Sequence, residues 1–288
     1  MTRRISIFGL GLMGRPIARV LREAGYIVRG WNRSPLPAEL SADIDVCTTL
    51  QAAADAGVCL LMLSDSTAVD AVLEQLDPHL QPGQLVIDMG SSDPLRSQAH
   101  AARLAERDIG WVDAPVSGGP EGAAAGSLAI MVGGTAEDVA QAWPILEALG
   151  GNVVHMGGAG AGHITKMINQ LIVGLTIATV AEALILAEGC GLDPRLVQEA
   201  LKGGFADSKI LQLHGRRMIE RSYVPGAKVT TQLKDLQLAQ TNAAKLGLRL
   251  PHLEQTLDQY RQMVEQGNGE LDHSAVHKLL DSTTQDKL

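Results

Sequence analysis

Residues 8–26 read FGLGLMGRPIARVLREAGY, and this segment places three glycines within six positions before an amphipathic helix pattern begins. Gly9, Gly11 and Gly14 have the spacing GxGxxG, and a short apolar strand pattern precedes them. In a strand–turn–helix unit the first glycine permits a tight turn, the second lets a pyrophosphate approach the backbone, and the third lets helix and strand pack closely. The start of the helix offers unpaired N–H groups to phosphates. The same spacing also occurs in ordinary glycine-rich turns, so its meaning depends on the surrounding chain.

Strand and helix patterns alternate through the first half of the chain. Short apolar strands are expected at residues 4–10, 27–32, 45–47, 58–63, 85–90, 110–115, 128–134 and 152–157. Helix patterns such as 93–108 and 135–149 lie between them and begin with Asp or Thr, which are common helix N-caps. This alternation predicts an α/β, Rossmann-type doubly wound sheet that is mostly parallel and covered on both faces. In that setting the glycine spacing indicates a dinucleotide site.

The strand patterns stop after the glycine run at residues 157–162. Residues 163–280 have helix patterns throughout, with breaks at 189–194, 202–208, 223–227 and 246–251. We therefore predict a dinucleotide-binding domain over 1–162 and an all-α domain for substrate binding and dimerisation over 163–288. The apolar segment 171–192 has the length of a membrane span, but Glu182 and Glu188 interrupt it. Such a segment favours a helix buried in a two-domain protein or a dimer.

Composition and charge exclude several classes of protein. The formal net charge of −8 argues against a nucleic-acid or membrane surface and favours a small-molecule ligand. The three cysteines form no CxxC pair, which is typical of a cytoplasmic protein. The eight histidines show no HExxH spacing, and no GxSxG surrounds a serine. We therefore expect neither a metal site nor a serine hydrolase.

The end of the second strand pattern indicates which dinucleotide binds. An NAD site usually carries Asp or Glu here to bind the ribose 2′-hydroxyl, whereas this chain reads GWNRSP at 30–35. Asn32 is neutral, Arg33 can pair with a 2′-phosphate, and Ser34 can donate a further hydrogen bond. We therefore expect NADP to be preferred and NAD to remain possible. The alternative is that Arg33 is an ordinary solvated surface arginine.

Four segments together resemble a known family: GLGLMG at 9–14, DAPVSGGPEGAAAGSLAIMVGG at 113–134, GAGAGHITKMINQ at 158–170 and TTQLKDLQLAQ at 230–240. They resemble the β-hydroxyacid dehydrogenases, relatives of the 3-hydroxyisobutyrate and 6-phosphogluconate dehydrogenases. Within that family the chain is most similar to the reductases of tartronate semialdehyde and of glyoxylate or succinic semialdehyde. The resemblance implies an NAD(P)-dependent oxidoreductase that interconverts a short oxo acid or semialdehyde with its hydroxy acid.

The resemblance also implies a role for each matching residue. Lys166 matches the catalytic acid/base, and Ser117, Gly118 and Gly119 match a cradle for the substrate carboxylate. Asn169 and Gln170 match polar partners of the lysine and the substrate. The implied cofactor contacts are Leu10, Leu12 and Met13 beside the three glycines, Met62, Leu63 and Ser64 in a loop, Ser91 at the nicotinamide end, and Lys234. Two positions depart from the family pattern: Ser64 replaces a usual proline, and Ala227 a frequent aromatic residue.

The residues support these roles independently. Lys166, Asn169 and Gln170 are spaced i, i+3, i+4, so they share one face of a helix. A partly desolvated lysine there can pass a proton to an alkoxide as hydride arrives; the alternative is that Lys166 pairs with an acid on a neighbouring helix. Successive backbone amides at 117–119 can form an anion-binding nest, although the same residues also suit a plain turn.

We expect a cytoplasmic homodimer or homotetramer that acts on a small carboxylic acid, with tartronate semialdehyde as the leading substrate. The enzymatic alternatives are 3-hydroxyisobutyrate and succinic semialdehyde or glyoxylate. Imine reductases share the glycine loop but typically lack the catalytic lysine that Lys166 matches. An alternative of another class is a non-catalytic module that only binds a dinucleotide.

Overall fold

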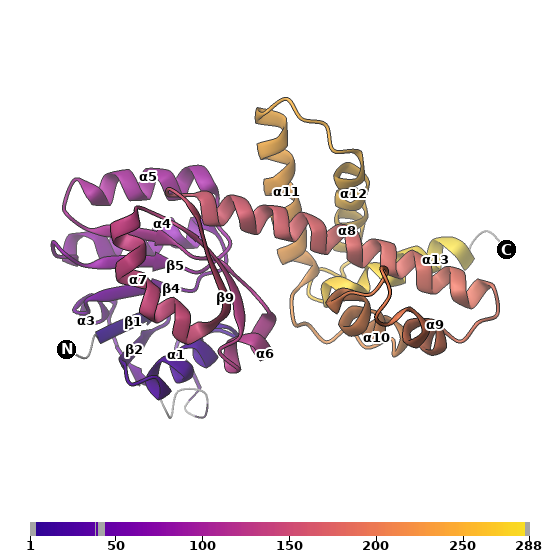
Figure 1. The fold of residues 1–288 in the computed structure, drawn as a ribbon, viewed down its shortest axis with the longest axis horizontal. Coiled ribbons are helices and arrows are strands. Elements are labelled where there is room, and N and C mark those ends of the chain that lie inside the picture. The colour runs from indigo at the N-terminus through magenta and orange to yellow at the C-terminus, as the bar shows by residue number, and fades with distance from the viewer. Residues whose placement is uncertain (1–3, 38, 40–43, 286–288) are drawn as a thin grey trace. The chain divides into compact units, whose positions relative to one another are not determined.

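The computed structural model describes residues 4–37, 39 and 44–285. The chain divides into two compact units, Met1–Lys166 and Met167–Leu288, called here the N-terminal and the C-terminal unit. The long helix α8 (Ala161–Gly189) contributes its first residues to the N-terminal unit and the rest to the C-terminal unit (Figure 1). The boundary predicted after residue 162 therefore falls within the first turn of this helix.

Strands and helices alternate in the N-terminal unit (Figure 1). The strands are β1 (Arg4–Phe8), β2 (Ile27–Trp31), β3 (Asp45–Val46), β4 (Val58–Leu61), β5 (Leu85–Asp88), β6 (Gly110–Asp113), β7 (Val116–Ser117), β8 (Leu128–Gly133) and β9 (Gly150–Gly157). The helices are α1 (Gly14–Glu23), α3 (Leu50–Ala54), α4 (Ser66–Leu76), α5 (Pro94–Ala105), α6 (Gly119–Ala124), α7 (Ala136–Leu149) and the 3₁₀ turn η1 (Asp77–His79).

The described residues of this unit form one nine-stranded sheet in the order β3-β2-β1-β4-β5-β6-β8-β7, and β9 pairs with β8. The run from β3 to β6 is parallel, which confirms the predicted Rossmann-type fold. The short strand β7 is an addition, since Val116 and Ser117 pair antiparallel with Ile130 and Ala129 of β8. Two residues are too few to give a periodic signal in the sequence.

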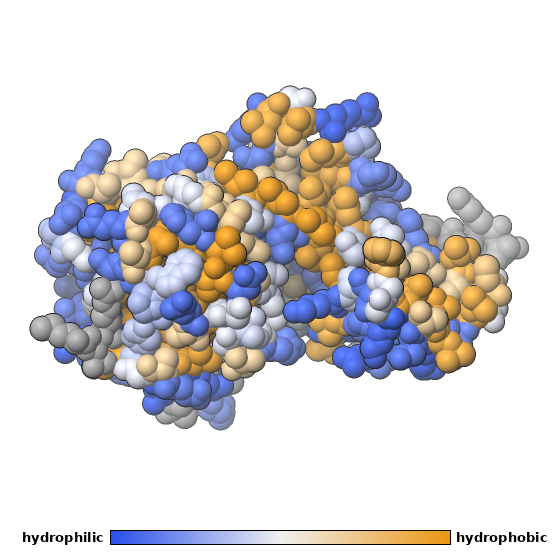
Figure 2. All heavy atoms as spheres, in the orientation of Figure 1, coloured by the Kyte–Doolittle hydropathy of each residue, from blue (hydrophilic) through white to orange (hydrophobic). Residues whose placement is uncertain are grey.

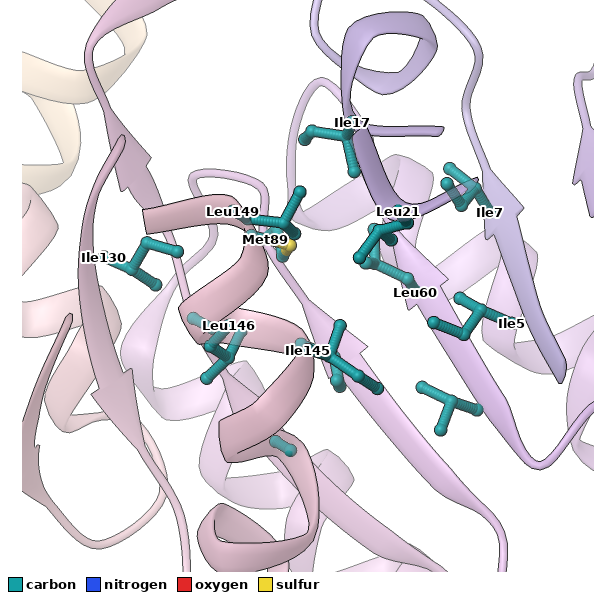
Figure 3. Packing of buried hydrophobic residues seen from close by; sticks show 14 of the residues in the cluster. Ile5, Ile7, Ile17, Leu21, Leu60, Met89, Ile130, Ile145, Leu146 and Leu149 are labelled. Atoms are coloured by element: carbon teal, nitrogen blue, oxygen red, sulfur yellow. The ribbon is translucent and has the colours of Figure 1, made fainter. Parts of the chain in front are cut away.

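Apolar residues are buried on both faces of the sheet, because side chains alternate along each strand. Ile5, Ile7 and Leu60 point into one core, where they pack with α1 and α7 (Figure 3). Their neighbours Cys59 and Leu61 point into the opposite core, which α4 and α5 cover. The near-continuous apolar strands of the sequence are explained by this double coverage.

The C-terminal unit is helical, as predicted, and an isolated bridge between Lys228 and Asp272 is the one strand-like pairing among its described residues. After α8 its elements are α9 (Pro194–Leu201), the π-helical turn η2 (Leu211–Gly215), α10 (Arg216–Ile219), α11 (Val229–Lys245), α12 (Pro251–Glu265), the 3₁₀ turn η3 (His273–Ala275) and α13 (Val276–Gln285). Ile177 and Leu184 of α8 pack into its core with Leu236, Leu257 and Tyr260.

By length and composition α8 could cross a membrane, a property that core helices of soluble proteins share. Ile164, Ile168 and Ile172 follow one another at four-residue spacing on one side of the helix, and each is at least 40% exposed. Figure 2 shows hydrophobic side chains gathered over this helix. The oligomer remains a prediction. An exposed apolar stripe of this kind is typical of a surface that contacts another protein chain.

Candidate active site

The three glycines of the loop between β1 and α1 have different surroundings. Gly9 has φ of +104°, and a Cβ there would lie 2.3 Å from the carbonyl oxygen of Met62. A Cβ on Gly14 would lie 1.9 Å from the carbonyl oxygen of Gly9. A Cβ on Gly11 would meet nothing within 4 Å. The first and third glycines are therefore required by the fold, whereas the space beside the second is open to a ligand, as a dinucleotide pyrophosphate requires.

The end of β2 is tied to the same loop. The Leu10 N–H donates a hydrogen bond to Oδ1 of Asn32 at 3.1 Å, and Nδ2 of Asn32 donates to the Ser34 carbonyl at 2.8 Å. Asn32 therefore holds the glycine loop in place through a hydrogen bond. Its lack of charge, the only property considered from the sequence, did not predict this role. Arg33 and Ser34 are both exposed beside it. Within the glycine loop Leu10 is buried, Leu12 is exposed and Met13 precedes the first residue of α1.

The loop after β4 lies against the glycine loop. Met62 donates its N–H to the Phe8 carbonyl at 2.8 Å. A Cβ on Gly9 would lie 3.1 Å from Leu63 Cδ2, and one on Gly90 would lie 2.8 Å from the Leu63 carbonyl oxygen. The fold thus brings Met62 and Leu63 beside the glycines. The Ser64 hydroxyl instead donates a hydrogen bond at 2.8 Å to Oδ2 of Asp65, the residue that caps α4.

The loop after β5 carries Ser91. Asp88, the last residue of β5, accepts hydrogen bonds from the Gly90 N–H and the Ser92 hydroxyl, both at 2.9 Å. These two bonds hold the backbone on either side of Ser91, which is half-buried. The position of Ser91 is therefore fixed by its neighbours.

Residues 117–119 form the junction between β7 and α6 rather than a simple hairpin turn. Ser117 ends β7, and Gly118 and Gly119 have φ of +138° and +67°, which L side chains rarely adopt. The Gly118 carbonyl accepts the Gly122 N–H at 3.1 Å and so starts α6. Both glycines are needed for the chain to turn at this point.

Lys166 is the last residue of the N-terminal unit, and only 9% of its surface is exposed. It lies in the second turn of α8, whose start is held by Asp113 at the end of β6. Asp113 accepts the Gly160 N–H at 2.7 Å through Oδ1 and the His163 N–H at 2.9 Å through Oδ2. A carboxylate from the sheet therefore caps this helix and complements its dipole.

In the C-terminal unit the predicted polar residues gather around Asp235, which the sequence reasoning missed. Asp235 is 3% exposed and accepts a hydrogen bond from Nε2 of Gln170 at 2.7 Å. Asn169 donates to Oε1 of Gln170 at 2.9 Å, and Nζ of Lys234 lies 3.2 Å from Oδ1 of Asp235. The sequence could have pointed to Asp235, because it directly follows Lys234, one of the residues that the motif singled out.

A second buried cluster surrounds Asp272 in the C-terminal unit. Its carboxylate accepts bonds from Arg217 at 2.6 Å and from the Ser274 hydroxyl at 2.6 Å, and His214 and His273 lie beside it. Burial alone raises the pKa of Asp272, but His214, His273 and Ser274 outweigh it and hold the pKa far below its usual range. The spacing of the two histidines and the carboxylate would suit a metal ion, but the donors already occupy the carboxylate. We interpret the cluster as a structural one, in which Asp272 links Arg217 to Ser274 and holds the fold together.

A dinucleotide-type glycine loop at the carboxyl end of a parallel sheet, followed by a helical domain, is typical of oxidoreductases that use a nicotinamide dinucleotide. Residues 4–158 match the family model for the NAD binding domain of 6-phosphogluconate dehydrogenase. Residues 160–280 match the family model for the NAD-binding region of NADP-dependent 3-hydroxyisobutyrate dehydrogenase. The chain belongs to the NAD(P)-dependent β-hydroxyacid dehydrogenases, the family that the sequence motifs resemble.

Named relatives cover nearly the whole chain. The 2-hydroxy-3-oxopropionate reductase of Escherichia coli (strain K12) is 37% identical over 99% of both chains. The NAD-dependent L-serine dehydrogenase of Pseudomonas aeruginosa is 32% identical over 98% of this chain and 99% of the relative. The structure of 3-hydroxyisobutyrate dehydrogenase from Mycobacterium tuberculosis with L-serine has a TM-score of 0.86 at 30% identity, covering 97% of this chain and 99% of the other. The chain is therefore a dehydrogenase or reductase in a family whose members differ in substrate.

Proposed function

We propose that the protein reduces a short oxo acid or semialdehyde with NADPH, and that 2-hydroxy-3-oxopropionate (tartronate semialdehyde) is its leading substrate. The carrying observation is the nearly buried Lys166 at the start of α8, which stands where the family motif has its acid/base. The choice among substrates is supported by the 37% identity with the E. coli reductase of that compound. The relative named as an L-serine dehydrogenase makes L-serine, another three-carbon acid, a competing substrate.

The proposed chemistry assigns one task to each group. The dinucleotide, when bound, supplies the hydride. Lys166 donates a proton to the carbonyl oxygen in reduction and accepts the hydroxyl proton in the reverse direction. Ser117, Gly118 and Gly119 bind the substrate carboxylate, and Asn169 and Gln170, on the same helix as Lys166, orient the substrate. The glycine loop, residues 32–34 and 62–64, Ser91 and Lys234 hold the cofactor.

A substrate panel with a matched lysine control tests this function. NADPH absorbance should fall faster with tartronate semialdehyde than with glyoxylate or succinic semialdehyde. The rise in NADPH absorbance when 3-hydroxyisobutyrate or L-serine is oxidised with NADP⁺ should be slower than that fall. Lys166→Met should lower kcat by about 10²- to 10⁴-fold with little change in NADPH affinity, because it keeps length but removes the proton. Lys245→Met, at the exposed end of α11, should match the wild type. Tight NADPH binding with no turnover of any substrate would instead identify a binding module.

The preference for NADPH is proposed from the residues after β2. A 2′-phosphate carries almost two negative charges, and the exposed Arg33 can meet it with a charge-assisted pair. We expect kcat/KM to favour NADPH over NADH by about 10- to 1000-fold, and Arg33→Ala to remove most of that factor. Arg29→Ala is a suitable control, since Arg29 lies within β2 and pairs with Asp45 at 3.2 Å. Equal use of NADH and NADPH by the wild type would refute the preference and leave the dehydrogenase assignment intact.

A further inference from the structure

A buried imidazole lies between two buried carboxylates at the carboxyl ends of neighbouring strands. Asp88 ends β5 and Asp113 ends β6, and the two residues are paired in the parallel register. The ring of His163 in α8 faces both: Nε2 lies 3.6 Å from Oδ2 of Asp88, and Nδ1 lies 3.8 Å from Oδ2 of Asp113. All three side chains have 0% exposure. Two carboxylates buried side by side repel each other, so the fold needs a polar group between them.

Nearby donors use only part of the hydrogen-bonding capacity of each carboxylate. Asp113 accepts the Gly160 and His163 N–H groups, and Asp88 accepts the Gly90 N–H and the Ser92 hydroxyl. Burial raises the pKa of Asp113, and the neighbouring His163 opposes this rise. Neither ring nitrogen of His163 makes a hydrogen bond to another of the described residues. A movement of less than about 1 Å would bring each nitrogen to hydrogen-bond distance of the carboxylate that it faces.

Each member of this group leads directly into a predicted site segment. Ser91 follows Asp88 by three residues, Ser117 follows Asp113 by four, and Lys166 follows His163 by three. Such short spans leave the chain little freedom between the buried anchor and the site residue. His163 and Lys166 also share one face of α8, because residues three apart on a helix are neighbours. All of these residues belong to the N-terminal unit.

We propose that His163 is a positioning residue for the reaction: its ring, with one proton shared with each carboxylate, bridges Asp88 and Asp113 and thereby fixes Ser91, Ser117 and Lys166 relative to one another. The proposal rests on the proposed function, because it takes Lys166 as the acid/base. An apolar side chain at 163 would leave the two carboxylates facing each other. A glutamine would restore a polar group with two N–H donors, but both sit on one nitrogen, whereas the imidazole presents a separate nitrogen to each carboxylate.

Steady-state kinetics separate positioning from general stability. His163→Leu should lower kcat by about 10- to 100-fold, as expected for a small misplacement of a catalytic group. NADPH affinity should stay within about threefold, because Ser91 is the one proposed cofactor contact that the bridge holds, whereas the glycine loop is built from β1 and α1. The kcat of His163→Gln should fall between that of His163→Leu and that of the wild type. A control is Ser97→Ala, which breaks the buried 2.9 Å hydrogen bond from Trp111 Nε1 in the same unit; it should lower Tm and leave kcat unchanged. A wild-type kcat in His163→Leu would overturn the proposal.

A proton NMR spectrum of the full chain in water tests the bridge without turnover. A ring N–H that donates to a buried carboxylate is protected from exchange with solvent, so we expect a slowly exchanging ring signal. This signal should vanish in His163→Gln and shift in both Asp88→Asn and Asp113→Asn. Absence of the signal, or a signal that is unchanged in both aspartate variants, would overturn the proposed bridge. If the wild type reduces no oxo acid, the proposed function fails, whereas the bridge is still judged by this spectrum.

Discussion

In the glycine loop, the effect of adding a single Cβ atom distinguishes a glycine that is needed for folding from one that is needed for binding. A Cβ at Gly14 would overlap the Gly9 carbonyl oxygen, whereas a Cβ at Gly11 would project into open space. Gly14→Ala should therefore destabilise the N-terminal unit by about 1–3 kcal/mol or prevent its folding, because the backbone must move. Gly11→Ala should keep the wild-type Tm.

The two alanine variants should also differ in binding. Gly11→Ala should weaken NADPH binding by about tenfold or more, because the new methyl group occupies the space that a pyrophosphate approaches. Thermal denaturation and fluorescence titration with NADPH measure the two quantities on the same sample. A Gly11→Ala variant that binds NADPH as the wild type does would mean that the phosphates lie elsewhere.

At the scale of an element, the start of α8 depends on close approach to the sheet. A Cβ on Gly162 would lie 2.4 Å from the Met131 carbonyl oxygen and 2.6 Å from that of Asp113. Alanine usually stabilises a helix relative to glycine by about 1 kcal/mol, but here overpacking should reverse the sign and cost about 1–3 kcal/mol. Gly162→Ala should also lower kcat, because it displaces the turn that carries Lys166.

Gly158 provides the control in the same glycine run, since a Cβ there would meet nothing within 4 Å and its φ is not positive. Gly158→Ala should leave both Tm and kcat close to the wild type. Thermal denaturation and steady-state kinetics of the two variants test whether the contact between Gly162 and the sheet matters for Tm and kcat. Equal behaviour of the two would show that the run is a flexible linker and that its contact with the sheet is unimportant.

At the scale of the whole molecule, acid should destabilise the C-terminal unit through His277. Burial, followed by the nearby charge of Arg221, lowers the pKa of His277 to about 4 from its ordinary value of 6.5, although Asp281 opposes the shift. Arg221 Nη1 lies 2.7 Å from the ring, and the Tyr223 hydroxyl lies 3.0 Å from Nδ1. The unfolded chain binds a proton at this histidine between pH 6.5 and about 4, whereas the folded chain does not. Stability is therefore full above pH 6.5 and falls by up to about 3 kcal/mol as the pH drops towards 4.

Tm measured from about pH 7.5 to about pH 4.5 tests this dependence. His277→Gln should flatten the decline because the titrating group is gone, even if Tm at neutral pH is lower. His252→Gln, at an exposed position in α12, should keep the wild-type slope. The buried Asp272 loses its partners' stabilisation only at more acidic pH, because its pKa lies far below the usual range. Identical slopes in all three proteins would contradict the role given to His277.

Local patterns predicted most of the architecture. The GxGxxG spacing, the alternation of strands with helices and the caps at Thr135 and Asp93 each depend on a few consecutive residues, so they could be read along the chain. The breaks between the helices after residue 163 were predicted for the same reason, since glycine and proline end helices locally. The identities of Lys166 and residues 117–119 came from motifs, and their roles remain proposals.

Contacts between distant segments required the folded chain. The sequence suggests a domain boundary at the glycine run 157–162, but the fold brings Asp113 to Gly160 across 47 residues and makes the run a tight helix start. In the same way Gln170 meets Asp235 across 65 residues, and Leu10 meets Asn32 across 22. A short polar side chain gives no periodic signal, and its partner is chosen by the packing of the sheet and helices. Amino-acid order therefore specified the elements and the chemical groups, whereas burial and long-range pairing determined which of those groups act together.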